Sequence, residues 1–404
     1  MAGRAGILKN KKKLALVLSG GGIKAAAFHI GVCLALKEKG FVFAGGSKDM
    51  VRHQHHPDPS KVFKIYVGSS AGAFVSTILA AGYDIESLIN AFELGFGGDY
   101  FVKEDSFKKL KQIGYRHVFS VNSKRLLRFL PEAILHKSLV QGGLEAFLKT
   151  GFKLDGLFTT KAMEAYLRKE VLLENEFDRL GVELYIVATQ LNHSRKAIFG
   201  PFKESYKNAS TKFINYASIS EAVACSTALP PVFSPYAIRN AEGKELYFYD
   251  GEIRETLSAH IAADHGADLV ISSYSVQPYH YVPEIGSLHK FGVPAIINQA
   301  LYQVIQQKIQ KHIEWQASSR QLYRMIDGFF KQGLLPEDQR DRVLAAVNLT
   351  LKHRPETDYI YISPRPQNYE MFFVDHFSLK PKVLEKIARI GFRSALSVLK
   401  QYDL

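Results

Sequence analysis

One serine in the sequence stands where a nucleophile would be expected. Residues 62–67 read as an apolar strand that stops abruptly, and residues 73–81 read as a helix of small and apolar residues. Between them lies Gly68-Ser69-Ser70-Ala71-Gly72, a G-x-S-x-G pattern that is typical of a tight strand-to-helix turn with an exposed serine hydroxyl. Gly68 and Gly72 fit such a turn because neighbouring backbone leaves no room for a Cβ atom. The helix start also directs amides toward Ser70, which we predict to be a nucleophile for acyl transfer.

A glycine-rich loop nearer the N-terminus is suited to stabilise the oxyanion that such a serine would generate. Gly20-Gly21-Gly22-Ile23-Lys24 follows a predicted strand at residues 14–18 and opens a predicted helix at 25–39. Successive amides in such a loop form a nest for an anion. Because loops after consecutive parallel strands share one edge of a sheet, we expect this loop to lie beside Ser70. A nucleotide-binding P-loop is excluded, since the G-x-x-x-x-G-K-[ST] pattern is missing.

The proton acceptor is predicted to be Asp250. It follows a predicted strand at residues 245–249, and Gly251 behind it allows a sharp turn toward the edge where Ser70 lies. A carboxylate within hydrogen-bond reach can act as a general base once burial raises its pKa. An ordinary hydrolase would use a histidine after the aspartate. Seven histidines follow Asp250, but none stands in a recognisable turn motif: His260, His265, His280, His289, His312, His353 and His376.

Composition narrows the class of protein. The 404 residues are 47% hydrophobic and 23% charged, as in a globular protein. The two cysteines, Cys33 and Cys225, lie in apolar segments, which predicts free thiols in a reducing compartment and hence a cytoplasmic protein. No C-x-x-C or H-E-x-x-H pattern occurs, so we expect neither a metal nor a cofactor. The histidines in the polar, proline-containing loop at residues 45–60 are interpreted as solvated.

The net charge of +13 favours an anionic partner. A basic tail at residues 1–13 and a Lys- and Arg-rich helical segment at 103–137 predict attraction to an anionic membrane surface, while a merely solvated basic face stays open for the second segment. No nucleic-acid recognition motif supports a nucleic-acid partner. No segment has the ~20 apolar residues that span a bilayer, and the apolar run after the tail is too short for a signal peptide. We therefore expect a cytoplasmic protein that attaches peripherally to a membrane.

The order of elements predicts an α/β fold with a mostly parallel sheet. Residues 182–189 form a near-continuous apolar run, as in strands that are buried on both faces. Further strands are predicted at 269–273 and 359–362, with helices at 293–331 and 382–399. No internal repeat or linker is visible. We therefore expect one domain over residues 14–404, with a catalytic core at about 14–275 and a helical extension at 280–404.

These motifs, in this order, resemble those of the patatin-like phospholipase family. The resemblance rests on the three motifs above, Gly20 to Lys24, Gly68 to Gly72 and Asp250-Gly251, and on Ala228-Leu229-Pro230-Pro231. It implies a three-layer α/β fold and a Ser70–Asp250 dyad without histidine. It also implies that Gly20 to Ile23 hold the oxyanion while Lys24 orients their loop. The implied substrate is a phospholipid or another acyl ester, cleaved as by a phospholipase A or a lysophospholipase.

Two positions depart from the family's pattern. Ala25 stands where the family usually has glycine, which a helix start tolerates. Glu252 stands where the family's Asp-Gly is usually followed by glycine or alanine. We expect Glu252 to point to solvent because strand-end turns are exposed. Otherwise it would lie near Asp250 and raise the pKa of that carboxyl by like-charge repulsion.

Two other functions stay open. One is a soluble esterase or thioesterase with the same dyad, for which the positive charge is incidental. The other is a lipid-binding module whose catalytic power has decayed, for instance through Glu252.

Overall fold

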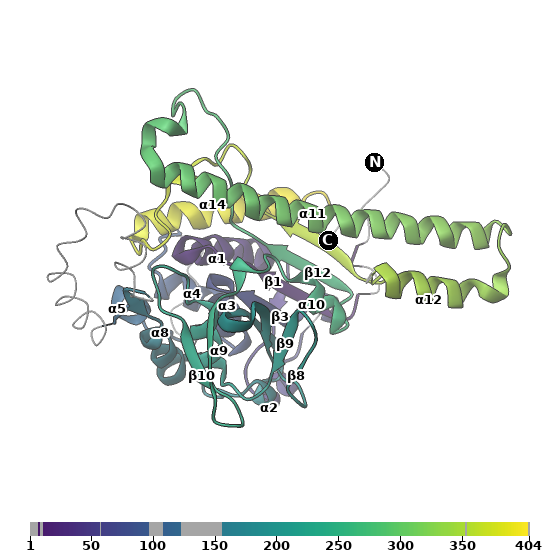
Figure 1. Ribbon diagram of the computed structural model, residues 1–404, viewed down its shortest axis with the longest axis horizontal. Coiled ribbons are helices and arrows are strands. Elements are labelled where there is room, and N and C mark those ends of the chain that lie inside the picture. The colour runs from purple at the N-terminus through teal and green to yellow at the C-terminus, as the bar shows by residue number, and fades with distance from the viewer. Residues whose placement is uncertain are drawn as a thin grey trace.

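A mostly parallel sheet forms the centre of the protein (Figure 1). The computed structural model describes residues 7–8, 11–56, 58–96, 108–122, 156–351 and 354–402. The longest run of strands has the order β13-β12-β1-β3-β6-β7-β9-β8. The first five of these are parallel to one another: β13 (Asp358–Ile362), β12 (Leu269–Ser273), β1 (Leu14–Leu18), β3 (Val62–Ser69) and β6 (Glu183–Gln190). The predicted α/β class with a mostly parallel sheet is confirmed.

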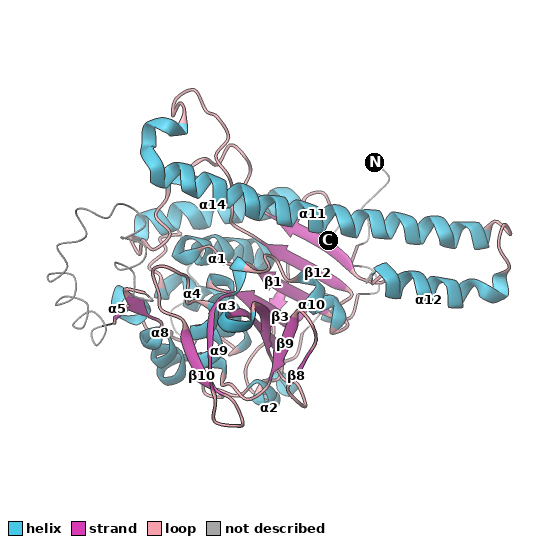
Figure 2. Ribbon diagram, viewed as in Figure 1, coloured by secondary structure: helices cyan, strands magenta, loops and turns pink. Residues whose placement is uncertain are grey.

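Helices cover both faces of this sheet (Figure 2). Alternate side chains of β1 point to opposite faces, as strand geometry requires. Its leucines pack with three helices, α1 (Gly22–Glu38), α3 (Ala71–Ala80) and α14 (Pro381–Leu399). Ala15 and Val17 instead pack with α10 (Ala259–Asp264) and with the middle of α11 (Gly292–Lys331). The result is the three-layer arrangement that the resemblance implied.

Beyond β6 the sheet is mixed, and one further strand reaches the site from there. Strand β7 (Arg195–Phe199) runs antiparallel to β6, and β11 (Glu245–Asp250) pairs antiparallel with the last residues of β6. Asp250 thereby lies opposite Ala188, at the carboxyl end of β6. The remaining strands are β2 (Val42–Phe43), β4 (Ser120–Val121), β5 (Phe158–Thr159), β8 (Tyr206–Lys207), β9 (Thr211–Ile214) and β10 (Tyr236–Arg239).

Helix α11 crosses the length of the molecule and, with α12 (Arg340–Leu351), projects beyond the sheet (Figure 1). No helix in the described ranges is both long enough and apolar enough to span a bilayer. Most of the basic segment predicted at residues 103–137 lies outside the described residues. The other described α-helices are α2 (Lys48–His53), α4 (Ile85–Ala91), α5 (Tyr115–Val118), α8 (Lys161–Tyr166), α9 (Ile219–Ser226) and α13 (Glu370–Phe373).

Candidate active site

Ser70 lies in the turn between β3 and α3 with a backbone conformation that is rare for a residue with a side chain. Its φ is 51° and its ψ is −120°, in a part of conformational space that costs energy and is found mainly at functional turns. Gly72 permits this turn, because a Cβ atom there would collide with the backbone of Leu18 in the neighbouring strand. The Gly72 amide donates to the Ser19 carbonyl at 3.1 Å, which ties the elbow to the loop after β1.

The backbone at Ser70 is held by a second serine that the sequence analysis did not single out. Ser226, the last residue of α9, accepts a hydrogen bond from the Ser70 amide at 2.8 Å. Its hydroxyl in turn donates to the Val187 carbonyl in β6 at 2.6 Å. Ser226 therefore links the elbow to the neighbouring strand. It stands in an ordinary helix of small residues, and no sequence pattern distinguishes it.

Asp250 lies beside Ser70. Ser69 pairs with Val187 of β6 and Asp250 pairs with the next residue, Ala188, which places the aspartate next to the elbow. The Glu252 amide donates a hydrogen bond to the Asp250 Oδ1 atom at 2.9 Å. Burial raises the pKa of Asp250 to about 6, although the nearby Ser70 side chain and the Glu252 amide pull this pKa down. No histidine among the described residues hydrogen-bonds to the Ser70 hydroxyl. The arrangement is thus a serine and a carboxylate that neighbour each other at one edge of the sheet.

The loop at residues 20–24 lies next to this pair, and its amides are used in different ways. The Gly20 amide donates to the Glu252 Oε1 atom at 2.7 Å, and the Ile23 amide donates to the His376 carbonyl at 2.7 Å. The amides of Gly21 and Gly22 have no partner in the described part of the chain. Gly22 has a φ of 73°, and a Cβ atom there would meet the His376 carbonyl. Of the amides predicted for the oxyanion, those of Gly21 and Gly22 are therefore the ones available.

Glu252 corrects one expectation from the sequence. It does not point to solvent but is buried against the loop at Gly20. The reason is the short 3-10 turn Gly251–Ile253, which folds the chain back under the sheet edge after Asp250. Burial, and after it the charge of Asp250, raises the pKa of Glu252 to about 8. At neutral pH the Glu252 carboxyl is therefore mainly uncharged. Glu252 lies near Asp250, as the second of the two expected positions required.

Lys24 and the C-terminal part of the chain form a hydrogen-bonded chain that returns to the glycine loop. Lys24 Nζ donates to the Tyr302 hydroxyl at 2.7 Å and to the Met371 carbonyl at 2.7 Å. The Tyr302 hydroxyl is 3.0 Å from His376 Nε2, and His376 Nδ1 is 3.3 Å from the Gly21 carbonyl. Assigned from this network, the tyrosine donates to Nε2 and the imidazole donates to Gly21. Burial lowers the pKa of Lys24 to about 7 and that of His376 to about 4, which fits a neutral imidazole.

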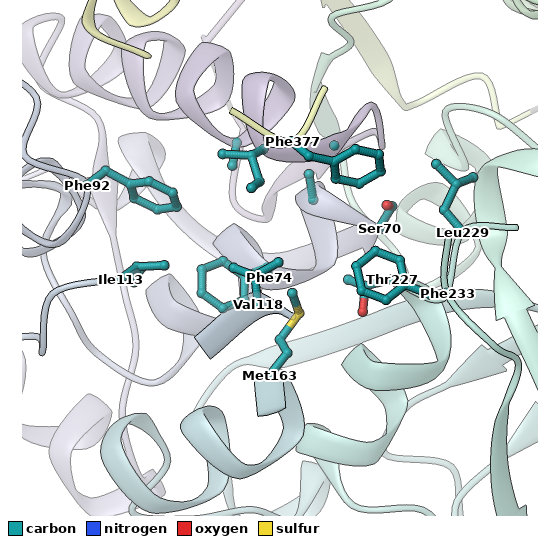
Figure 3. A pocket seen from close by; sticks show the side chains of 14 residues that line it. Ser70, Phe74, Phe92, Ile113, Val118, Met163, Thr227, Leu229, Phe233 and Phe377 are labelled. Atoms are coloured by element: carbon teal, nitrogen blue, oxygen red, sulfur yellow. The ribbon is translucent and has the colours of Figure 1, made fainter. Parts of the chain in front are cut away.

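An apolar cavity of about 60 Å³ opens beside Ser70 (Figure 3). In that view Ser70 lies at one end, and Phe92 and Ile113 lie at the other. Its walls come from α1, α3, the helical lobe after α4, the segment after α9 and the C-terminal segment. Among the lining residues, only Ser70 and Thr227 have side-chain oxygens. The lining residues are Gly22, Ile23, Ala26, Ser70, Ala71, Phe74, Phe92, Ile113, Val118, Met163, Thr227, Leu229, Phe233 and Phe377. Its almost entirely apolar lining suits hydrocarbon groups next to Ser70.

Sequence reasoning named Ser70, Asp250 and the glycine loop as candidates but missed most of the residues that surround them. Phe377, Tyr302 and His376 are separated from Ser70 by more than two hundred residues, and no motif marks them. In the described ranges, no group of three or more His, Cys, Asp or Glu side chains is placed to hold a metal ion.

Comparison with known proteins identifies the family. The model of the family described as "Patatin-like phospholipase" matches residues 16–263, and the chain therefore belongs to this family. Its members are lipid acyl hydrolases, and so is this protein. The matched range contains the glycine loop, Ser70 and Asp250 but ends before Tyr302 and His376.

Among solved structures, the chain is similar to VipD from Legionella pneumophila, with 16% identity and a TM-score of 0.37. The alignment covers 97% of this chain and 67% of the VipD chain. No curated protein matches the sequence.

Proposed function

We propose that the protein hydrolyses the acyl esters of membrane phospholipids, as a phospholipase A or a lysophospholipase does, with Ser70 as nucleophile and Asp250 as proton acceptor. The observation that carries this proposal is that the elbow at Ser70 and Asp250 meet at one end of β6, with Ser70 lining an apolar cavity. The amides of Gly21 and Gly22, for which the described residues offer no hydrogen-bond partner, lie in the adjoining loop. These are the nucleophile, base and anion site that acyl transfer needs.

In the first half of the reaction, Ser70 Oγ attacks the ester carbonyl carbon as its proton passes to Asp250. The carbonyl oxygen becomes an oxyanion, for which the Gly21 and Gly22 amides and the start of α1 supply positive charge. The C–O bond to the lysolipid then breaks, and the proton on Asp250 passes to the departing alkoxide. An acyl-enzyme on Ser70 remains.

In the second half, a water molecule gives its proton to Asp250 and attacks the acyl carbon. Collapse of the second oxyanion breaks the bond to Ser70 Oγ, which recovers the proton from Asp250. A pKa of about 6 suits this role, because the carboxylate is still ionised at neutral pH yet is a stronger base than an exposed aspartate. The cavity holds the acyl chain throughout.

The decisive variant is Ser70→Ala, for which we expect hydrolysis of phospholipid vesicles and of p-nitrophenyl esters to fall by at least ~10⁴-fold. A fluorophosphonate should label the unmodified protein at Ser70 and leave the variant unlabelled. Retained turnover, or a catalytically silent protein that the probe does not label, would contradict the dyad. In the second case the protein would be a binding module.

Substrate class is tested by product analysis. Phospholipid vesicles, an acyl-CoA and a short soluble ester should be compared at equal enzyme concentration, and we expect fatty acid release from the vesicles to dominate. Faster acyl-CoA or short-ester cleavage would support a soluble thioesterase or esterase instead.

We also propose that the enzyme is located in the cytoplasm and binds an anionic membrane surface. The net charge of +13 supports attraction to an anionic membrane surface, which should weaken as salt is raised. The thiols of Cys33 and Cys225 are free and buried, which supports the reducing environment of the cytoplasm. We also propose that the helical extension at residues 280–404 belongs to the same domain as the catalytic core, since His376 and Phe377 complete the site.

A further inference from the structure

The N-terminal half of α11 carries an apolar face that no described part of the chain covers. Val293 is 66% exposed, Ile297 55%, Leu301 57% and Val304 52%. These residues are spaced by four, four and three positions and therefore lie on one side of the helix. Side chains of this kind are ordinarily turned inward on an amphipathic helix, so a contiguous row of them on the outside indicates a contact surface.

The opposite side of the same helix reaches the glycine loop. Tyr302 is buried there and bonds to Lys24 and His376, which hold the loop through the hydrogen-bonded chain described above. A helix with its side chains is about 10–12 Å across. The apolar face and the catalytic loop thus lie on opposite sides of one helix.

The start of α11 also contacts the segment that leads to the wall of the cavity. Phe291, just before α11, is half exposed and packs on Phe373 of α13, with ring centroids 5.0 Å apart. Four residues after Phe373 the chain contributes Phe377 to the wall of the cavity. The residue just before α11 therefore packs on the same short segment, residues 373–377, that supplies Phe377 to the cavity wall.

The charges around this face indicate what covers it. Between Glu284 and Glu314 the charged side chains are Lys290, Lys308 and Lys311, all basic. A second copy would present the same patch in a symmetric dimer, and lysines would then face lysines. An anionic lipid surface complements both the lysines and the apolar side chains between them.

We propose that the face formed by Val293, Ile297, Leu301 and Val304 docks the protein on the surface of an anionic membrane. This inference rests on the proposed function, because docking would bring the cavity to its lipid substrate. The binding itself does not depend on turnover, so the two can be tested separately.

The experiment measures co-sedimentation with vesicles of equal parts phosphatidylcholine and phosphatidylglycerol, using full-length Ser70→Ala protein so that the vesicles stay intact. In this background we compare Leu301→Asp and Ile297→Asp/Leu301→Asp with Leu173→Asp. Leu173 is a matched control because it is 80% exposed and lies outside α11. We expect at least tenfold weaker binding for Leu301→Asp, a larger loss for the double variant and no change for Leu173→Asp. Vesicles of phosphatidylcholine alone should bind the unchanged face much less.

The same substitutions in the active protein should leave hydrolysis of a soluble short ester unchanged, which shows that the fold and the site are intact. Equal vesicle binding by all variants, or no binding by any, would overturn the docking face. A dimer that Leu301→Asp dissociates would overturn it in favour of a second copy. If instead Ser70→Ala protein still hydrolyses esters while Leu301→Asp weakens binding, the proposed dyad fails and the docking face stands.

Discussion

The two parts of the chain contribute differently to the site. The family-matched part, residues 16–263, carries the groups that would change bonds during the reaction, Ser70 and Asp250, and the loop at Gly20. The part after residue 263 carries none of them, yet it contacts the glycine loop through His376 and lines the cavity with Phe377. Ser70 and Asp250 thus both lie in the matched part, while the glycine loop forms hydrogen bonds with both parts.

The glycine loop shows this division most clearly. At its start, Gly20 is bound by Glu252 of the matched part, and at its end, Ile23 is bound by the His376 carbonyl of the C-terminal part. The two middle amides are left without a described partner. Clamping both ends of a short loop fixes the direction of its middle amides, which is what preorganised stabilisation of an oxyanion requires.

If the matched part supplies the groups that react, replacing Asp250 should lower activity more than any other substitution except that of Ser70. We expect Asp250→Asn to lower kcat by about 10²–10⁴-fold, because the amide accepts a hydrogen bond but cannot take the proton. The measurement is steady-state hydrolysis of a soluble ester, with circular dichroism as the control for folding. A well-folded Asp250→Asn protein with full kcat would mean that another group removes the proton.

If the C-terminal part holds the loop, a single hydroxyl there should affect the chemical step. Tyr302→Phe breaks the hydrogen-bonded chain from Lys24 to Gly21, and we expect kcat to fall about tenfold, or about 1.4 kcal/mol, with little change in KM. The rate of fluorophosphonate labelling should fall in parallel, since it reports the same anion site.

Tyr281→Phe is the matched control, because Tyr281 is exposed and its substitution removes the same hydroxyl. Equal kcat for both tyrosine variants would show that the chain from Lys24 to Gly21 does not position the loop. A change confined to KM would place Tyr302 in substrate binding instead.

Glu252→Gln is expected to change catalytic activity least at neutral pH, and this change should grow as the pH is raised. Activity of the unchanged protein should rise as Asp250 ionises through about pH 6 and fall as Glu252 ionises above about pH 8, where a new charge lies beside Asp250 and Gly20. Glutamine can still accept from Gly20 but cannot ionise. The variant should therefore keep the acid limb of the pH profile and lose the alkaline one; an unchanged alkaline limb would contradict this role.

Glu252 should also make the free energy of unfolding depend on pH, and this free energy should decrease as pH rises. The unfolded chain releases the Glu252 proton at its ordinary pKa of 4.5, whereas the folded protein keeps it to about 8. Unfolding therefore becomes more favourable as pH rises through this window, and the penalty is fully present above it. We expect Glu252→Gln to be the more stable protein by about 2–3 kcal/mol at pH 7 and to show no advantage at pH 4, measured by denaturant unfolding.

The sequence predicted the sheet well because its strands are buried on both faces. A run such as residues 182–189 has to be apolar throughout, and it was placed within one residue of β6. The glycine motifs were legible for a similar reason, since Gly72 lies too close to the backbone of Leu18 to allow a side chain. The orientation of Glu252 was predicted wrongly, because a short turn after a strand can direct a side chain outward or inward, and its local sequence does not distinguish the two.

By itself, the sequence determined the class of fold, the family and the residue types available for acyl transfer. These follow from local patterns: buried strands, tight turns and the spacing of glycines around Ser70. Only the tertiary structure decided which amides stay free, where Glu252 lies and that Tyr302, His376 and Phe377 meet the glycine loop. Those outcomes depend on contacts between residues hundreds of positions apart, which the packing of the whole chain sets and no local pattern encodes.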